Sequence, residues 1–202
     1  MDLKTSVHFP TIIYQCQKPE WISLTLEKCQ PHFDLKKAKE PELKKIFPVY
    51  QTDSIHHDPE LKYLTQFIVE TSMGILDGQG YDLSHHELFF EDMWAQEVYT
   101  YGHHFPHVHG NSQISGFFFL ECPEDGIYPL FYDPRAGKTM TDLPEKNRDD
   151  LTVATYECNY KPIPGTFMFF NSWLPHGFQL NSNDNPNKFI HFNIGARRKY
   201  EK

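Results

Sequence analysis

Four of the seven residues from 103 to 109 are histidines, and the largely apolar stretch ISGFFFL follows within a few residues. Neutral imidazole is a common metal ligand in proteins. Residues two apart in an extended chain point to the same side, so we expect His107 and His109 to face together while Val108 faces away. His103 and His104 are adjacent and cannot both join that face. The HxH pair therefore predicts half of a metal site.

A third ligand is expected from a distant part of the chain. His176 lies 67 residues after His109, where the apolar run from Phe167 to Phe170 ends in the turn-like sequence NSWLPHG. All-β folds bring remote strands side by side, so this gap in sequence is no obstacle. Three neutral ligands with open positions are typical of a catalytic metal centre. Imidazole binds iron, zinc, copper and nickel, so the ligand type alone does not select the metal.

The segment that carries these histidines is predicted to be mainly β. From Glu87 onward, short apolar runs alternate with Gly, Pro, Asn and Asp, at a spacing typical of sandwiches and barrels. We therefore expect a jelly roll, with a polar, lid-like loop over residues 136–150. The runs are LFFEDMWAQEVYTY, SQISGFFFLECP, IYPLFYDP, LTVATYEC, GTFMFFNSW, GFQL and KFIHFNIG.

The first 86 residues are predicted to form a helical and strand extension of this core. Residues 7–14 (VHFPTIIY) resemble a strand whose proline favours an edge position. The lysine-rich stretch 28–45 is expected to be rich in turns. A helix is predicted near residues 59–77, because Asp58 is a favourable N-cap, Pro59 suits the first turn, and apolar residues follow at helical spacing.

Composition limits the class of protein. The 202 residues suit one domain over 1–202, with the extension at 1–86 and the jelly-roll core at 87–202. The formal net charge of −8, from 27 acidic and 19 basic residues, argues against nucleic acid and anionic membranes as partners. No leader pattern or apolar run of about 20 residues is present, which predicts a cytoplasmic protein. The four widely spaced cysteines are expected to be free thiols.

Several of these motifs together resemble a known enzyme family. The stretch WAQEVYTYGHHFPHVHGNSQISGFFFL, the following FYDPR, and the late GTFMFFNSWLPHGF and KFIHFNIG are similar to Fe(II)- and 2-oxoglutarate-dependent oxygenases. More narrowly, they resemble a prolyl-hydroxylase-like group found in phages and marine bacteria. These landmarks cover about residues 94–195, and the amino-terminal half carries no comparably specific motif. The resemblance implies a double-stranded β-helix, which is a form of jelly roll.

The resemblance also implies roles for particular residues. Iron would be held by His107, His109 and His176, which would form the catalytic centre. Most oxygenases of the wider class have Asp or Glu at the second of these positions, and an all-histidine set supplies one negative charge fewer. Asp133 in FYDPR, or a water molecule, is therefore an alternative second ligand.

The far carboxylate of 2-oxoglutarate is expected to need a cation. Lys188 lies twelve residues after His176, about where the family places an arginine. However, Lys188 lies five residues before Asn193, whereas the family's arginine lies an even number before this asparagine. Either a β-bulge turns Lys188 inward, or Arg135 or Arg197 is the cation for this contact.

The activity implied is hydroxylation of a C–H bond in a peptide or a small molecule, with release of succinate and CO2 and with ascorbate as a possible reductant. Two alternatives remain open from the sequence. One is a cupin-like three-histidine metalloenzyme that does not use 2-oxoglutarate. The other is a non-catalytic jelly-roll binding or virion-associated module whose histidines are structural.

Overall fold

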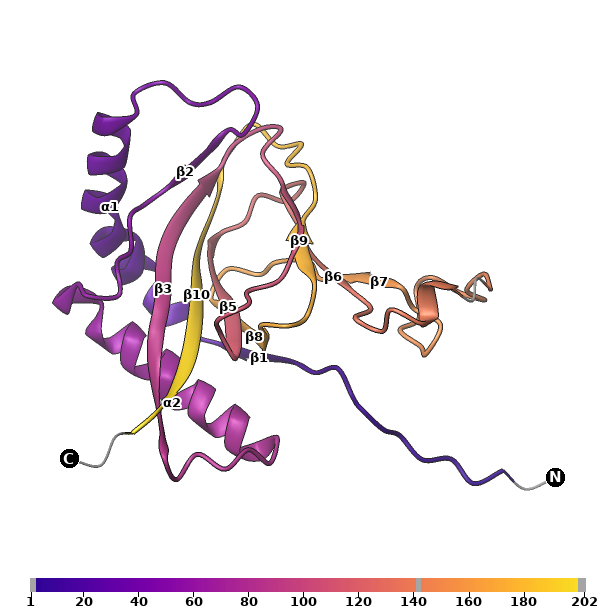
Figure 1. The fold of residues 1–202 in the computed structure, drawn as a ribbon. Coiled ribbons are helices and arrows are strands. Elements are labelled where there is room, and N and C mark those ends of the chain that lie inside the picture. The colour runs from indigo at the N-terminus through magenta and orange to yellow at the C-terminus, as the bar shows by residue number, and fades with distance from the viewer. Residues whose placement is uncertain (1–2, 141–142, 200–202) are drawn as a thin grey trace.

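The computed structural model describes residues 3–140 and 143–199, which form two antiparallel sheets and two helices (Figure 1). The larger sheet has the strand order β1-β8-β5-β10-β3-β2, and the smaller has the order β4-β9-β6-β7. This arrangement confirms the mainly β, double-stranded β-helix prediction. The strands are β1 (Ile13–Gln17), β2 (Val49–Gln51), β3 (His86–Val98), β4 (His104–His107), β5 (Ile114–Glu121), β6 (Pro129–Tyr132), β7 (Glu157–Asn159), β8 (Thr166–Asn171), β9 (His176–Phe178) and β10 (Asn187–Arg198).

The long apolar strands of the larger sheet are buried on both faces. Along β5, Phe117 and Phe119 belong to a core that contains residues of both sheets, including Phe131 and Phe178 of the smaller one. The intervening Phe118 belongs to a second core on the helical side of the larger sheet. This alternation explains the near-continuous FFFL sequence, because a strand covered on both faces needs apolar residues at every position.

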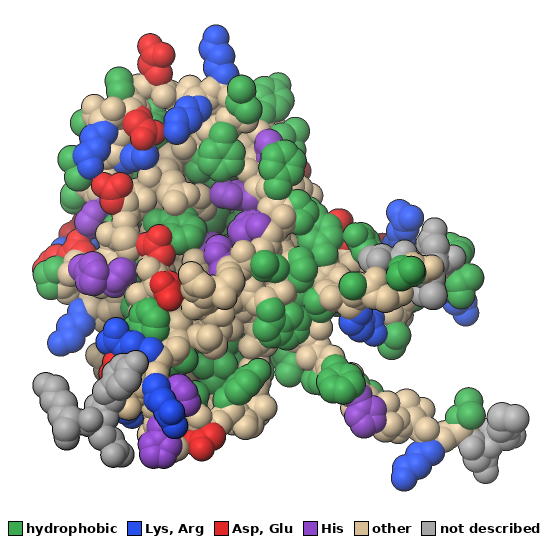
Figure 2. Space-filling view, in the orientation of Figure 1, with side chains coloured by type: hydrophobic (Ala, Val, Ile, Leu, Met, Phe, Trp, Pro, Cys, Tyr) green, Lys and Arg blue, Asp and Glu red, His purple; other side chains and the backbone are tan. Residues whose placement is uncertain are grey.

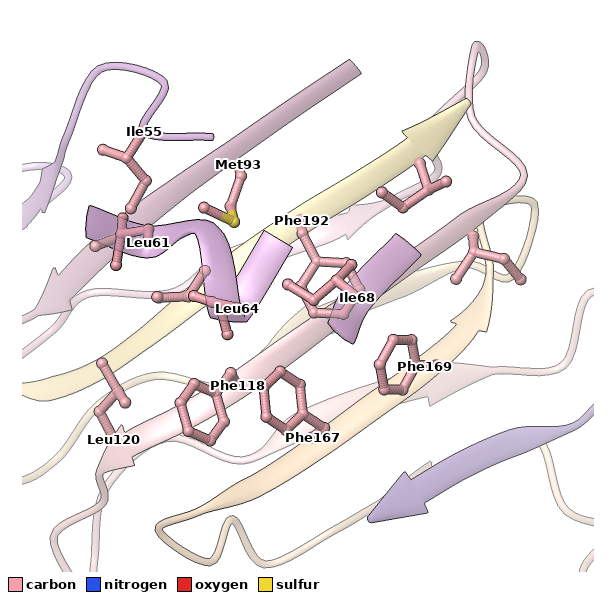
Figure 3. Packing of buried hydrophobic residues seen from close by; sticks show 14 of the residues in the cluster. Ile55, Leu61, Leu64, Ile68, Met93, Phe118, Leu120, Phe167, Phe169 and Phe192 are labelled. Carbon is pink, nitrogen blue, oxygen red and sulfur yellow. The ribbon is translucent and has the colours of Figure 1, made fainter. Parts of the chain in front are cut away.

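The helices α1 (Ile22–Lys39) and α2 (Lys62–Gly78) cover the outer face of the larger sheet. In Figure 3, Leu64 and Ile68 of α2 lie over Phe118, Phe167 and other apolar side chains of the sheet. Phe118 and Phe167 stack with ring centroids 4.0 Å apart. None of the described helices is long and apolar enough to cross a membrane.

The predicted helix near 59–77 is confirmed. It begins with the short 3-10 helix η2 (Pro59–Leu61) and continues as α2. The Asp58 carboxylate accepts a hydrogen bond from the Glu60 backbone N–H at 2.9 Å, as expected of an N-cap.

The turn-rich prediction for residues 28–45 is wrong over residues 28–39, because α1 runs through Lys39, whereas residues 40–45 are irregular. A second short 3-10 helix, η1 (Pro19–Trp21), leads into α1. Pro31 lies inside α1, and this proline together with the basic residues of α1 makes the sequence look like a surface loop. Some of these charges are paired across elements instead: Lys37 Nζ lies 2.6 Å from the Glu97 carboxylate, and Lys28 Nζ lies 2.9 Å from that of Glu60.

Two strand predictions also need correction. The first strand is Ile13–Gln17 rather than 7–14, and it is an edge strand, paired with β8 from Ile13↔Phe170 to Gln17↔Thr166. Of the run LTVATYEC, only Glu157 and Cys158 enter the short strand β7. The predicted loop 136–150 contains the short 3-10 helix η3 (Lys138–Met140) and is largely exposed where it is described. In Figure 1 the described part of this loop extends away from the sheets, beyond β7.

Candidate metal centre

The pairing of β4 with β9 brings two histidines of the predicted triad together. His107 and His176 are directly opposite in this antiparallel pair, with ring centroids 4.5 Å apart. The chain then leaves β4, and the His109 backbone N–H donates to the Ser172 carbonyl at 3.0 Å. The His109 ring is thereby placed 5.0 Å from that of His107 and 5.2 Å from that of His176. One candidate ligand atom from each of the three residues lies within 4.8 Å of the others.

A glycine allows the two strands to approach this closely. Gly177 lies between His176 and Phe178 on β9, facing β4. A Cβ atom at this position would lie 2.5 Å from the His104 carbonyl oxygen, closer than van der Waals contact allows. Any side chain at position 177 would therefore push β4 and its histidine away from His176.

Backbone carbonyls orient two of the rings. His107 Nδ1 lies 2.7 Å from the Phe105 carbonyl and His176 Nδ1 lies 2.9 Å from the Leu174 carbonyl. Because a carbonyl only accepts, each Nδ1 carries the proton and donates. Each Nε2 is then left unprotonated, as a metal ligand must be.

The environment keeps the imidazoles of His176 and His109 neutral. Burial, together with the neighbouring His107, lowers the pKa of His176 to about 3 and that of His109 to about 4. His176 is buried, His109 is half-buried and His107 is exposed. The triad therefore opens to solvent on the His107 side, and Figure 2 shows His side chains gathered near a hollow on one face.

Aromatic rings enclose the inner side of the triad. The His176 ring lies 4.6 Å from Phe170, 5.9 Å from Phe117 and 6.4 Å from Phe131, measured between centroids. The buried Nε2 atoms of His109 and His176 have no hydrogen-bond partner. Unpartnered acceptors among aromatic rings are unfavourable unless a ligand binds them. The three imidazole ligands thus fit a divalent transition metal such as iron.

The remaining polar residues of this region lie outside the triad. His104 faces Phe47 and Phe178, and burial lowers its pKa to about 4. His103 Nδ1 contacts the Tyr101 carbonyl. Neither belongs to a metal-binding group of the described residues, which agrees with the prediction that both could not face the metal.

Asp133, the alternative second ligand, also lies outside the metal-binding group. Its carboxylate is bound by Arg135, with Nη2 at 2.6 Å, and by Lys138 at 3.5 Å. These cations, Arg135 first, lower the pKa of Asp133 to about 2. The structure therefore places His109, rather than Asp133, beside the other two histidines.

The structure does not bring the predicted cations to the triad. Lys188 Nζ lies between Glu121, at 3.1 Å, and Glu97, at 3.6 Å. Its neighbours on β10, Phe189 and His191, face the space between the sheets, so Lys188 faces the outer side, which α1 covers. The unfavourable parity noted in the sequence explains this placement.

The two alternative cations are paired near the surface. Arg135 is exposed and bound to Asp133, and Arg197 Nε lies 2.6 Å from the Glu87 carboxylate. The placement of all three cations gives no support to a contact with 2-oxoglutarate.

A further histidine beside the triad, His191, is buried and was not predicted from the sequence. His191 on β10 stacks on Trp94 of β3, with ring centroids 4.4 Å apart and planes at 10°. Its ring also lies 4.9 Å from that of His109. The sequence contained one usable signal, since alternation along KFIHFNIG puts His191 on the same face as Phe189 and Asn193.

No curated protein matches the sequence, but solved structures share the fold. A prolyl-4-hydroxylase from Pseudomonas putida is 13% identical, with a TM-score of 0.57 and 94% of each chain covered. The viral collagen prolyl hydroxylase of Paramecium Bursaria Chlorella virus-1, solved as a 2OG complex, is 13% identical, with a TM-score of 0.56 over 90% of this chain and 94% of that one. A Trichoplax adhaerens prolyl hydroxylase, in complex with a hypoxia inducible factor peptide, is 10% identical, with a TM-score of 0.57 over 90% of this chain and 83% of that one.

At these identities the solved structures establish the fold alone. The family is established by a sequence model described as "Putative 2OG-Fe(II) oxygenase", which matches residues 92–193, half of the chain. This range contains all three histidines of the triad and ends at the Phe-Asn pair on β10. The chain therefore belongs to the 2OG-Fe(II) oxygenase family.

Proposed function

We propose that the protein is an Fe(II)- and 2-oxoglutarate-dependent hydroxylase that acts on a C–H bond of a peptide or a small molecule. The observation that carries this proposal is the convergence of His107, His109 and His176 on one point, with unpartnered Nε2 atoms at the latter two. Bound iron and 2-oxoglutarate would supply the oxidising chemistry, with succinate and CO2 as products and ascorbate as a reductant. The protein's task is to bind and orient the metal, the 2-oxoglutarate and the substrate, and to exclude water.

The residues around the triad suit these tasks. The carbonyls of Phe105 and Leu174 hold the protons of His107 and His176 at Nδ1, and so keep each Nε2 directed to the metal. The aromatic wall behind His176 excludes water from the inner side, which protects a reactive centre.

Exposed apolar side chains close to the triad in sequence are consistent with an organic substrate. Phe105 is 76% exposed and Val108 is 50% exposed, and they flank His107. Trp173, which precedes His176 by three residues, is 48% exposed. Exposed apolar groups beside a reactive centre are typical of binding sites. The peptide bound to the Trichoplax adhaerens prolyl hydroxylase is consistent with a peptide substrate.

Turnover of 2-oxoglutarate tests the proposed function. Purified protein supplied with Fe(II), ascorbate, oxygen and 2-oxoglutarate should form succinate, slowly without substrate and faster with an accepted peptide or small molecule. The His176→Ala variant should form none. A wild-type protein that binds metal but forms no succinate would instead favour the cupin-like alternative. One that binds no metal would favour a structural role for the histidines.

A further inference from the structure

Polar atoms without partners are concentrated beside the triad. His191 has no hydrogen-bond partner at either ring nitrogen, and the Trp94 indole N–H is also buried without one. His191 is only 4% exposed. Leaving a buried polar group unpaired costs about 1–3 kcal/mol, so such groups mark a place where a ligand binds.

The position of His191 suits contact with a small molecule that is bound to the metal, rather than direct contact with the metal. It does not belong to the group of three whose ligand atoms converge. Measured between centroids, its ring lies 4.9 Å from His109 and 6.2 Å from His176, and it also stacks on Trp94. A neutral imidazole offers one N–H donor and an indole offers another. Both can donate to the carboxylate of a 2-oxo acid that chelates the metal.

Within the described residues, no buried positive charge lies in this part of the molecule. None of the Lys and Arg side chains in the described ranges is buried. Farther along the inner face of β10, Phe189 packs 4.8 Å from Phe178 and 5.8 Å from Phe117, and the next inward residue is the neutral Asn187. A second carboxylate buried here would lose its hydration without gaining a counter-charge, which is strongly unfavourable.

We propose that this chain binds its 2-oxo acid through the neutral donors of His191 and Trp94, and does not select for a charged far end. This inference rests on the proposed function and makes it more specific. 2-Oxo acids with an uncharged far end should bind about as well as 2-oxoglutarate. Two probes test this directly: 2-oxopentanoate, which has a methyl group in place of the far carboxylate, and the 5-amide of 2-oxoglutarate.

Calorimetric titration of Mn(II)-loaded protein without oxygen measures these affinities independently of turnover. We expect the dissociation constants of the two probes with an uncharged far end to lie less than tenfold above that of 2-oxoglutarate, or below it. A preference of tenfold or more for 2-oxoglutarate over both probes would overturn the inference and leave the proposed function intact. Failure to bind Mn(II), or any of the three acids, would overturn both.

Three variants separate recognition from folding. His191→Phe keeps the ring stacked on Trp94 but removes its N–H, and Trp94→Phe removes the indole N–H. Each variant should weaken the binding of all three acids at least fivefold without changing the affinity for Mn(II). A smaller effect from both variants would contradict the inference. The matched control is Lys188→Met, which should leave all three affinities unchanged. A selective loss of 2-oxoglutarate binding in that variant would make Lys188 the missing cation and overturn the inference.

Discussion

His107 and His176 face each other across the β4–β9 pair with ring centroids 4.5 Å apart, although 69 residues separate them in sequence. Replacing either by alanine should weaken Mn(II) binding by more than about a hundredfold, since even the outer hydrogen-bond partners of metal ligands contribute ~10–100-fold. Calorimetry without oxygen measures this. His103→Ala is the matched control, because its ring contacts Phe105 and lies outside the triad. Equal losses in the control and the triad variants would contradict the assignment.

Gly177→Ala tests the close approach of the strands. The added Cβ would lie 2.5 Å from the His104 carbonyl, so we expect the unfolding free energy to fall by about 1–3 kcal/mol and Mn(II) binding to weaken. Denaturant unfolding and calorimetry measure the two effects. The control is Gly74→Ala in α2, where a Cβ has open space and should stabilise the protein by ~0.5–1 kcal/mol. Unchanged stability in Gly177→Ala would mean that β4 and β9 lie farther apart than described here.

His104 should make the stability of the protein depend on pH. Burial lowers its folded pKa to about 4, while the unfolded chain titrates near 6.5. The unfolded state therefore binds the proton first, and stability is lost as pH falls from 6.5 toward 4, by up to about 1.4 kcal/mol per pH unit. His104→Phe should show a correspondingly shallower decline in unfolding free energy over this range. Parallel curves for the variant and the wild type would show that His104 is not buried in its neutral form.

Asp133→Asn separates a structural carboxylate from a metal ligand. Because Arg135 lowers the pKa of Asp133 to about 2, the ionised carboxylate stabilises the fold above pH ~4, and this contribution disappears as pH falls to about 2. The variant should be less stable at neutral pH and should bind Mn(II) as tightly as the wild type. A large loss of metal affinity would make Asp133 a ligand and displace His109 from that role.

The parts of the site that depend on local alternation were readable from the sequence. His109 joined His107 as the HxH spacing predicted, although it lies beyond the end of β4, where its backbone N–H donates to the Ser172 carbonyl. Likewise, the Asp58 N-cap and the apolar spacing predicted α2 correctly. For α2, the element's own capping and spacing determine the outcome, whereas His109 also depends on its hydrogen bond to Ser172.

Features that depend on contacts between distant elements were not readable. Helix α1 looked like a loop, because its stability comes from packing on the sheet and from pairs such as Lys37 with Glu97. The outward direction of Lys188, by contrast, was already indicated by its odd spacing from Asn193, but its ion pair with Glu121 of β5 was not. The importance of His191 depends on Trp94 in a neighbouring strand, which the sequence does not reveal. A cytoplasmic location and a phage or marine bacterial origin stay predictions.

A crystal structure of the protein with Mn(II), grown without oxygen and with anomalous data at the manganese edge, tests the central assignment most directly. We predict one manganese ion bound by His107, His109 and His176, with its remaining coordination positions open to the side of His191 and Trp94. An ion bound elsewhere, or histidine rings at 107 and 176 turned away from each other, would contradict the account.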